Sequence, residues 1–184
     1  MGRTNTEFEL RGINHLALVC SDMERTVDFY TNVLGMPLVK TIELPQNMGQ
    51  HFFFDIGGGD CLAFFWFPNA PAAAPGIASS AGLPGVGDLT TAHASMNHVA
   101  FDVSPEKFDE YVKRLQEKGV EVSGIMNHDD SEWGVSREVT DDVFVRSVYF
   151  FDPDGILLEF AAWTREMRED DVRHAPARAL SATS

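Results

Sequence analysis

Two histidines occupy equivalent positions in two similar stretches of this chain. The first stretch, NHLALVCS at residues 14–21, contains His15, and the second, NHVAFDVS at residues 97–104, contains His98. A neutral imidazole is a common ligand of transition metals. A duplication that presents one imidazole from each of two symmetry-related strands therefore predicts a metal site.

A carboxylate near the end of the second repeat supplies a third candidate ligand. Side chains alternate between the two faces of a strand, and the apolar alternate positions of residues 156–160 leave Glu159 on the other face. His15 and His98 fall in the same way on the mixed faces of their strands, so we expect all three side chains to point into one cup. Two imidazoles and one carboxylate form the facial triad that suits Fe(II), with Mn(II) as a substitute. Such a set leaves coordination positions open for a chelating substrate and dioxygen.

The equivalent place in the first repeat carries no ligand. The ends of the two repeats align at an offset of 97, which pairs Phe-Asp at 54–55 with Phe-Asp at 151–152. This offset places Leu62 opposite Glu159, and shifting the alignment by one or two residues brings no acidic side chain there. The predicted cup therefore has four corners, of which three carry ligands.

The same offset predicts the other residues that line the cup. Tyr149 falls on the face of Glu159, and we expect it to orient the substrate, whereas His51 is predicted to point away. Among the remaining histidines, His128 is the preferred acid–base group, because it lies in a polar loop of the second repeat. The predicted substrate-binding wall is mostly aromatic and consists of Gln50, Phe52, Phe64 and Trp66.

Two βαβββ units must position these residues. Each unit begins with an apolar strand, continues with a helix of 3.6-residue periodicity and ends with three strands. The first helix is expected to begin at a capping box of Ser21 and Glu24, and the second at Ser104 with Pro105 in its first turn. The strands that follow the helices are expected at 38–44, 50–56 and 60–67, and again at 120–126, 143–151 and 156–163.

The predicted fold class is α+β, with two βαβββ modules forming a cup-shaped mixed β-sheet and helices on the outside. The first module covers residues 1–67 and the second covers residues 96–163. Residues 68–95 are rich in Pro, Ala and Gly and are expected to be a linker or cover, and residues 164–184 a C-terminal tail.

Composition limits the possible partners. The chain has 184 residues, 44% of them hydrophobic, and a formal net charge of −14, which argues against nucleic acid, anionic membranes and polyanionic substrates. No apolar run reaches the ~18 residues of a membrane span. Cys20 and Cys61 both lie in apolar runs and are interpreted as reduced core residues of a cytoplasmic protein.

Three segments resemble the vicinal oxygen chelate superfamily, which contains glyoxalases, bleomycin resistance proteins, fosfomycin resistance proteins and extradiol dioxygenases. These segments are INHLALVCSDMERTVDFYTNVLGMPLV at 13–39, MNHVAFDV at 96–103 and RSVYFFDPDGILLEF at 146–160. The resemblance implies a small-molecule substrate and one metal in a cup built from two modules. The modules would come from one chain or be exchanged between the chains of a homodimer.

The resemblance also ranks the possible activities. Glyoxalase-type and epimerase-type members usually supply a fourth ligand where Leu62 stands, whereas extradiol dioxygenases and fosfomycin thiol transferases use His, His and Glu. Extradiol enzymes also carry a tyrosine ten residues before the glutamate, as Tyr149 is here, although Thr140 stands where they have a pocket histidine. We expect an Fe(II)-dependent extradiol-type dioxygenase acting on a small aromatic or enediol-like substrate. The alternatives are a glyoxalase-like isomerase or lyase, a fosfomycin-resistance-like thiol transferase, and a drug-binding protein of the bleomycin-resistance kind.

Overall fold

The computed structural model describes residues 7–178; the first six residues and the last six residues of the predicted tail lie outside it. The first module consists, in chain order, of β1 (His15–Cys20), α1 (Met23–Asp28), the π-helical turn η1 (Phe29–Val33), β2 (Leu38–Glu43), the 3-10 turn η2 (Pro45–Asn47), β3 (Gln50–Gly57) and β4 (Asp60–Trp66). The cap of α1 is Asp22, whose carboxylate accepts the Arg25 N–H at 3.0 Å. The predicted cap at Ser21 is therefore wrong by one residue.

The second module repeats this order with a hairpin added. It consists of β5 (Val99–Asp102), α2 (Phe108–Glu117), β6 (Met126–His128), β7 (Val135–Ser136), β8 (Val145–Phe151) and β9 (Leu157–Trp163), followed by η3 (Glu169–Asp171).

Two expected boundaries in the second module are wrong. α2 does not begin at Pro105, because the Ser104 hydroxyl donates to Glu106 instead of capping the helix, and residues 105–107 form a turn. The strand expected at 120–126 is reduced to an isolated bridge of Val122 with Phe150. β6 begins only at the end of that range and pairs with β7 inside the predicted polar loop.

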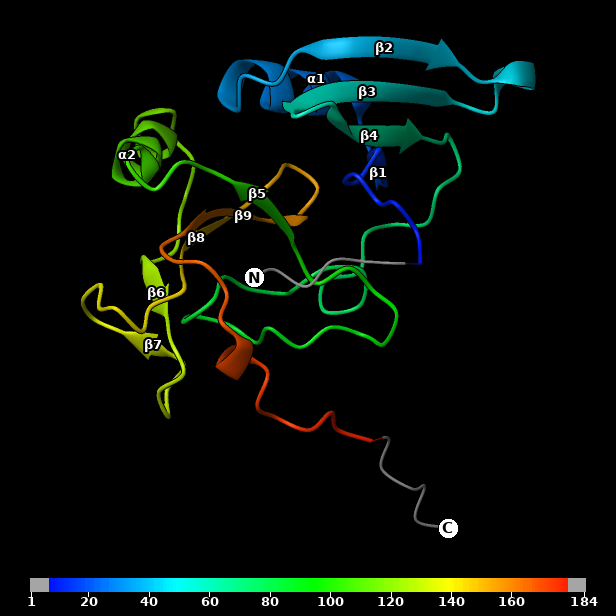
Figure 1. Ribbon diagram of the computed structural model, residues 1–184. Coiled ribbons are helices and arrows are strands. Elements are labelled where there is room, and N and C mark those ends of the chain that lie inside the picture. The colour runs from blue at the N-terminus through cyan, green and yellow to red at the C-terminus, as the bar shows by residue number, and fades with distance from the viewer. Residues whose placement is uncertain (1–6, 179–184) are drawn as a thin grey trace.

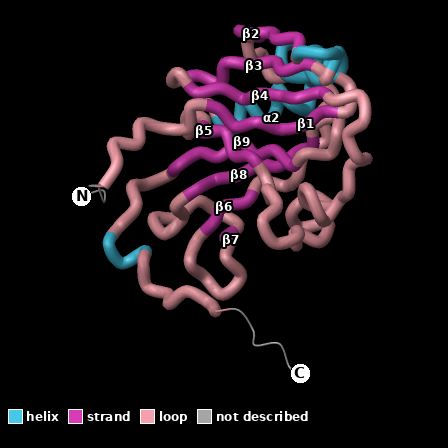
Figure 2. Tube along the Cα trace, turned by 90° about the vertical axis from the view of Figure 1, so that its right-hand side faces the viewer, coloured by secondary structure: helices cyan, strands magenta, loops and turns pink. Residues whose placement is uncertain are grey.

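Two open sheets carry the fold. The first has the strand order β1-β4-β3-β2 and the second has the order β5-β9-β8-β6-β7. In each sheet the opening strand is parallel to the last strand of its module, and the remaining pairs are antiparallel. Figures 1 and 2 show the two sheets one above the other, with β2 at one end of the molecule and β7 at the other. The α+β architecture of two βαβββ units is thus confirmed.

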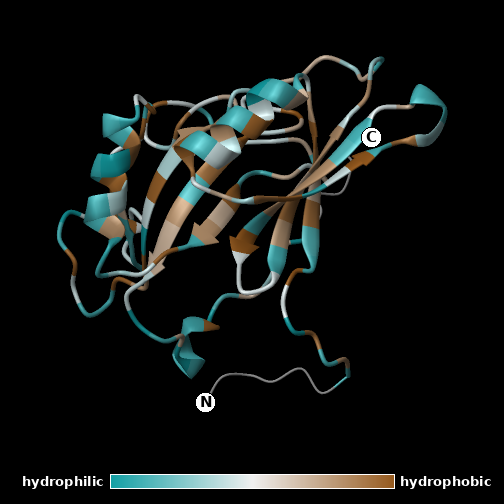
Figure 3. Ribbon diagram, turned by 90° about the horizontal axis from the view of Figure 1, so that it is seen from above, coloured by the Kyte–Doolittle hydropathy of each residue, from teal (hydrophilic) through white to brown (hydrophobic). Residues whose placement is uncertain are grey.

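The larger of two hydrophobic clusters is shared by both modules, and a smaller one lies within the second module. Tyr30, Phe54 and Phe64 of the first module pack in the same buried cluster as Phe150 and Leu158 of the second. In Figure 3 brown, hydrophobic residues lie along the strands, and the helices carry both teal and brown residues. The shared core lies on the helix-covered face of each sheet. The other face of each sheet, called its uncovered face below, points away from this core.

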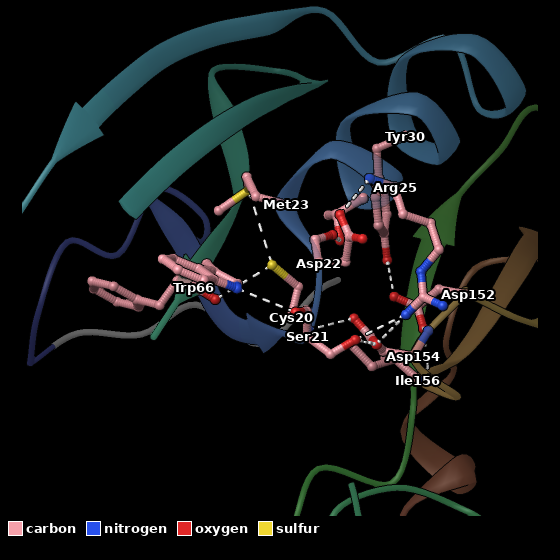
Figure 4. A network of polar contacts seen from close by, with 12 residues as sticks. Cys20, Ser21, Asp22, Met23, Arg25, Tyr30, Trp66, Asp152, Asp154 and Ile156 are labelled. Carbon is pink, nitrogen blue, oxygen red and sulfur yellow. Dashed lines mark hydrogen bonds and ion pairs between the residues drawn. The ribbon is translucent and has the colours of Figure 1, made fainter. Parts of the chain in front are cut away.

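Polar contacts lock the modules together beside this core (Figure 4). The turn between β8 and β9 presents Asp152, which accepts a hydrogen bond from the buried Tyr30 hydroxyl at 3.1 Å. Asp154 of the same turn accepts the Ser21 N–H at 3.0 Å and pairs with Arg25 at 2.8 Å. Burial raises the pKa of Asp152 to about 6, and burial next to this carboxyl raises the pKa of Tyr30 well above its usual value.

Hydrogen bonds and ion pairs also attach the segments outside the modules to the rest of the fold. Residues 68–95 contain no helix or strand, and Ser79 in this segment accepts the Leu157 N–H at 3.0 Å. After β9, Arg165 pairs with Asp171 at 2.8 Å, and Arg173 pairs with Asp130 of the loop between β6 and β7. Within residues 7–178, no helix is both long and apolar enough to cross a membrane.

Candidate metal centre

Strand pairing fixes which residues of the two modules are equivalent. β1 pairs with β4 so that Ala17 lies beside Ala63, and β5 pairs with β9 so that Ala100 lies beside Glu159. Ala17 follows His15 by two residues, as Ala100 follows His98. Glu159 is therefore equivalent to Ala63, and the offset is 159 − 63 = 96 instead of the predicted 97.

The antiparallel pairs agree with this offset, since Phe53 lies beside Ala63 and Tyr149 lies beside Glu159. The matching Phe-Asp pairs that suggested 97 are one residue out of register. Asp55 is still paired with Cys61 within the hairpin, whereas Asp152 begins the turn after β8.

A register error of one residue reverses the face of every side chain in a strand. The fourth corner is therefore Ala63 and not Leu62, so it still carries no ligand. The predicted substrate-binding residues lie on the helix-covered face and not in the cup, so the prediction for these residues is wrong. On that face Phe64 is fully buried with its ring 4.9 Å from that of Tyr30, and the Trp66 indole donates to the Ser21 carbonyl at 3.2 Å. Gln50 and Phe52 share this face, because they pair with Trp66 and Phe64.

The uncovered face of the first sheet carries a different set of aromatic side chains. His15 contacts Phe53 edge to face, with ring centroids 5.5 Å apart, and Phe53 contacts His51 at 4.3 Å. His51 in turn stacks on Phe65 at 3.6 Å, nearly parallel to it. His51 therefore shares the face of His15, contrary to the prediction. The sequence signal that could have found it is its place two residues from Phe53, but only once Phe53 is known to pair with Ala63.

The uncovered face of the second sheet brings two predicted ligands together. The Nε2 atom of His98 lies 3.0 Å from the Oε2 atom of Glu159, and only 5% of Glu159 is exposed. Burial disfavours the charged form of Glu159, but hydrogen bonds from His98 and Ser147, together with the charge that His98 carries when it is protonated, outweigh burial and lower the carboxyl pKa.

Tyr149 and His128, the two predicted catalytic residues, lie beside this pair. The Tyr149 ring is 5.7 Å from that of His98, and its hydroxyl is 3.4 Å from Nε2 of His128. Burial, together with the negative charge of Glu159, raises the pKa of Tyr149 to about 12. Tyr149 is thus a protonated donor at neutral pH. His128 belongs to β6 and not to a loop.

Both candidate histidine ligands are oriented by the asparagine that precedes them. Nδ1 of His15 lies 2.8 Å from the amide oxygen of Asn14, and Nδ1 of His98 lies 2.8 Å from that of Asn97. An amide oxygen only accepts, so each neutral ring carries its proton on Nδ1 and its lone pair on Nε2, the state of a metal ligand. The Asn97 amide is fixed in turn by donation to the Leu89 carbonyl at 2.7 Å.

This arrangement fits a cation at the His98–Glu159 pair. A lone pair on Nε2 and a carboxylate oxygen at 3.0 Å repel each other unless they share a proton or a metal ion. His15 is not part of this pair. Among the described residues, no three His, Cys, Asp or Glu side chains gather closely enough to hold a metal ion. One chain thus brings together two of the three predicted ligands.

The comparisons with known proteins agree with this architecture. Residues 12–160 match the model of the Glyoxalase/Bleomycin resistance protein/Dioxygenase superfamily. The fosfomycin resistance protein FosX of Listeria innocua is 35% identical over 160 residues, covering 86% of this chain and 95% of that protein. The glutathione transferase FosA of Serratia marcescens is 27% identical over 175 residues, covering 95% and 97%. The metallothiol transferase FosB of Shouchella clausii is 27% identical over 150 residues, covering 82% and 79%.

Solved structures share the fold. A glyoxalase family protein from Enterococcus faecalis has a TM-score of 0.57 at 22% identity, covering 84% of this chain and 99% of that one. FosX from Listeria monocytogenes, complexed with Mn(II) and sulfate, has a TM-score of 0.53 at 20% identity, covering 84% and 94%.

Proposed function

The chain belongs to the Glyoxalase/Bleomycin resistance protein/Dioxygenase superfamily, and from that premise we propose that it is a divalent-metal-dependent thiol transferase acting on a small electrophile. The observation that carries the proposal is the His98–Glu159 pair, with its oriented imidazole and buried carboxylate. The relatives FosA and FosB are named as a glutathione transferase and a metallothiol transferase. The expected extradiol dioxygenase and its iron are not supported by these relatives, and the thiol-transferase alternative is.

The proposed metal ligands are His98 and Glu159 of one subunit and His15 of the partner subunit. The shared core on the helix-covered faces explains why one chain does not unite the three, since the two uncovered faces lie on the outside of that core. In a two-fold dimer every contact occurs twice. A homodimer that joins the uncovered face of each first sheet to that of a second sheet would create two equivalent sites.

The bound divalent metal would act as a Lewis acid toward the oxygen atoms of the electrophile. Tyr149, which stays protonated at neutral pH, donates a hydrogen bond to substrate oxygen, and His128 holds the Tyr149 hydroxyl in place. The face formed by Phe53, Phe65 and His51 packs an aromatic or apolar substrate body. Aromatic rings form most of this face, and Lys40 of β2 lies beside Phe53. We therefore propose an aryl-substituted electrophile in preference to a multiply charged one.

The first experiment measures conjugation of glutathione or cysteine to fosfomycin and to a panel of aryl epoxides, with Mn(II), in air and under nitrogen. The proposal expects metal-dependent product that is the same in both atmospheres. His15→Ala and Glu159→Gln should lose turnover and bound Mn(II), whereas His174→Ala, an exposed histidine in the tail, should keep both. Oxygen consumption with catechols, or Mn(II) binding that survives Glu159→Gln, would contradict the proposal.

Mixing two inactive variants tests the shared site directly. A heterodimer of His15→Ala and Glu159→Ala chains contains one doubly damaged site and one intact site. Random mixing makes half the dimers hetero, so about one quarter of the wild-type activity should return. If each site were formed within one chain, mixing the two variants would restore no activity.

A further inference from the structure

We propose that His51 is the catalytic base of the cup, the residue that takes the proton from the attacking thiol; this rests on the proposed function. His51 lies on β3, on the uncovered face of the first sheet, two strands from His15.

The hydrogen bond of His51 defines its protonation. Nδ1 lies 3.1 Å from the backbone carbonyl oxygen of Phe64. A carbonyl oxygen only accepts, so the neutral ring carries its proton on Nδ1 and presents a lone pair at Nε2. No described residue forms a hydrogen bond with Nε2. This leaves an imidazole nitrogen that can accept a proton, on the aromatic face where the substrate body is proposed to pack.

The ring is also held rigidly. Only 8% of His51 is exposed, one face stacks on Phe65 at 3.6 Å with 5° between the planes, and Phe53 contacts it at 4.3 Å. A fixed ring keeps Nε2 in one place and reduces the entropy lost when a reactant is aligned with it.

The internal symmetry places His51 beside the vacant corner of the metal site. At the offset of 96, His51 is equivalent to Ser147, which neighbours Glu159 diagonally across β8 and β9. His51 is in the same way the diagonal neighbour of Ala63 across β3 and β4. Diagonal neighbours are about 7–8 Å apart. Ala63 supplies no ligand at its corner, and His51 flanks that corner.

His128 is less suited to this task, because its Nε2 is the atom that contacts the Tyr149 hydroxyl. The other titratable groups on the face of His51 are Lys40 on β2, Asp55 on β3, Cys61 on β4 and His15 on β1. None of these four side chains has a contact with the His51 ring in the described structure.

The proposed step balances in atoms and charge. Nε2 of His51 removes the proton from the thiol S–H while the sulfur electron pair forms a bond to the electrophilic carbon. The C–O bond of the substrate breaks, and its electron pair goes to oxygen. The proton on Nε2 then passes to that oxygen, which regenerates neutral His51 and gives the hydroxy thioether.

The matched variant is His51→Asn, whose amide nitrogen replaces Nδ1 as donor to the Phe64 carbonyl but which offers no base. We expect kcat to fall at least about 100-fold, with the acidic limb of its pH profile lost and Mn(II) stoichiometry unchanged. His93→Asn, an exposed histidine in the 68–95 segment, should match wild type in all three measurements. A wild-type kcat and pH profile in His51→Asn would overturn the proposal.

Long-range ¹H–¹⁵N NMR of the metal-free protein provides a test that needs no turnover. The neutral His51 ring should show its proton on Nδ1, and a proton on Nε2 would overturn the inference. If wild type turns over no substrate with any thiol, the proposed function fails, and the NMR result still decides whether His51 has the stated tautomer. If wild type is active and His51→Asn equals it, only the His51 inference fails.

Discussion

Replacing Asp152 with Asn should weaken the dependence of protein stability on pH. Asp152 lies in the turn between β8 and β9, where it contacts Tyr30 of the first module, and only 5% of it is exposed. Burial raises its pKa from 3.8 to about 6, although the N–H groups of Ile156 and Asp154 oppose this by donating to the carboxylate at 2.8 Å. Asn can accept these two bonds without carrying a charge.

The sign of the effect follows from which state, folded or unfolded, binds the Asp152 proton more tightly. The folded protein keeps the Asp152 proton up to about pH 6, whereas the unfolded chain releases it near pH 3.8. The contribution of this group to the free energy of unfolding is therefore fully present below pH 3.8 and is lost as pH rises through about 6. Integration gives a loss of about 2 kcal/mol between about pH 4.5 and about pH 7.5.

Urea unfolding of both proteins across this interval measures the effect. Relative to wild type, Asp152→Asn should gain about 2 kcal/mol on going from the lower to the higher pH. Tyr30→Phe removes the hydroxyl that donates to the carboxylate at 3.1 Å, so it should move the loss to higher pH. Curves for wild type and Asp152→Asn that stay parallel within about 0.5 kcal/mol would refute the reasoning.

Three further changes test the fold and the site. Lys118→Met should cost about 1 kcal/mol in urea unfolding, since its ammonium donates to the Asn32 and Val33 carbonyls at 2.7 and 2.6 Å; Lys113→Met, a control on the same helix, should cost less than about 0.5 kcal/mol. Gly49→Ala should cost more than about 3 kcal/mol or prevent folding, because its Cβ would lie 1.9 Å from the Trp66 carbonyl oxygen. A Gly49→Ala protein that melts within a degree of wild type would contradict that contact. Mn(II) should raise the melting temperature as its concentration increases, and EDTA should reverse the rise.

The elements could largely be predicted from the sequence, and their alignment could not. Helical periodicity and turn residues identified both βαβββ units. The register of the last strands depends on period-two alternation, but QHFFFD and CLAFFWF place large apolar residues at consecutive positions. Both faces then look equally apolar, and the accidental match of two Phe-Asp pairs decided for the wrong offset. That error of one residue moved His51 out of the predicted cup and moved into it Gln50 and three aromatic residues that pack in or against the core, Phe52, Phe64 and Trp66.

The ligand set depended on a different kind of information. His98 directly precedes β5, and β5 runs parallel to the neighbouring strand β9 that carries Glu159, so local alternation was enough to bring the two residues together. His15 belongs to the other module, and its distance from them depends on how the modules pack. The packing is decided by Tyr30, Phe54 and Leu158 in the shared core, residues whose sequence pattern shows that they are buried but not against which partner.

The shared core also bears on how such a chain could arise. A single ancestral repeat would have exposed the apolar surface that Tyr30 and Phe54 now bury against the second module. It would therefore have needed a second copy of itself to cover that surface. In this chain the two repeats are joined by a connecting segment, so the association takes place within one molecule, at an effective concentration set by the tether. Residues 68–95 therefore make formation of the shared core independent of protein concentration.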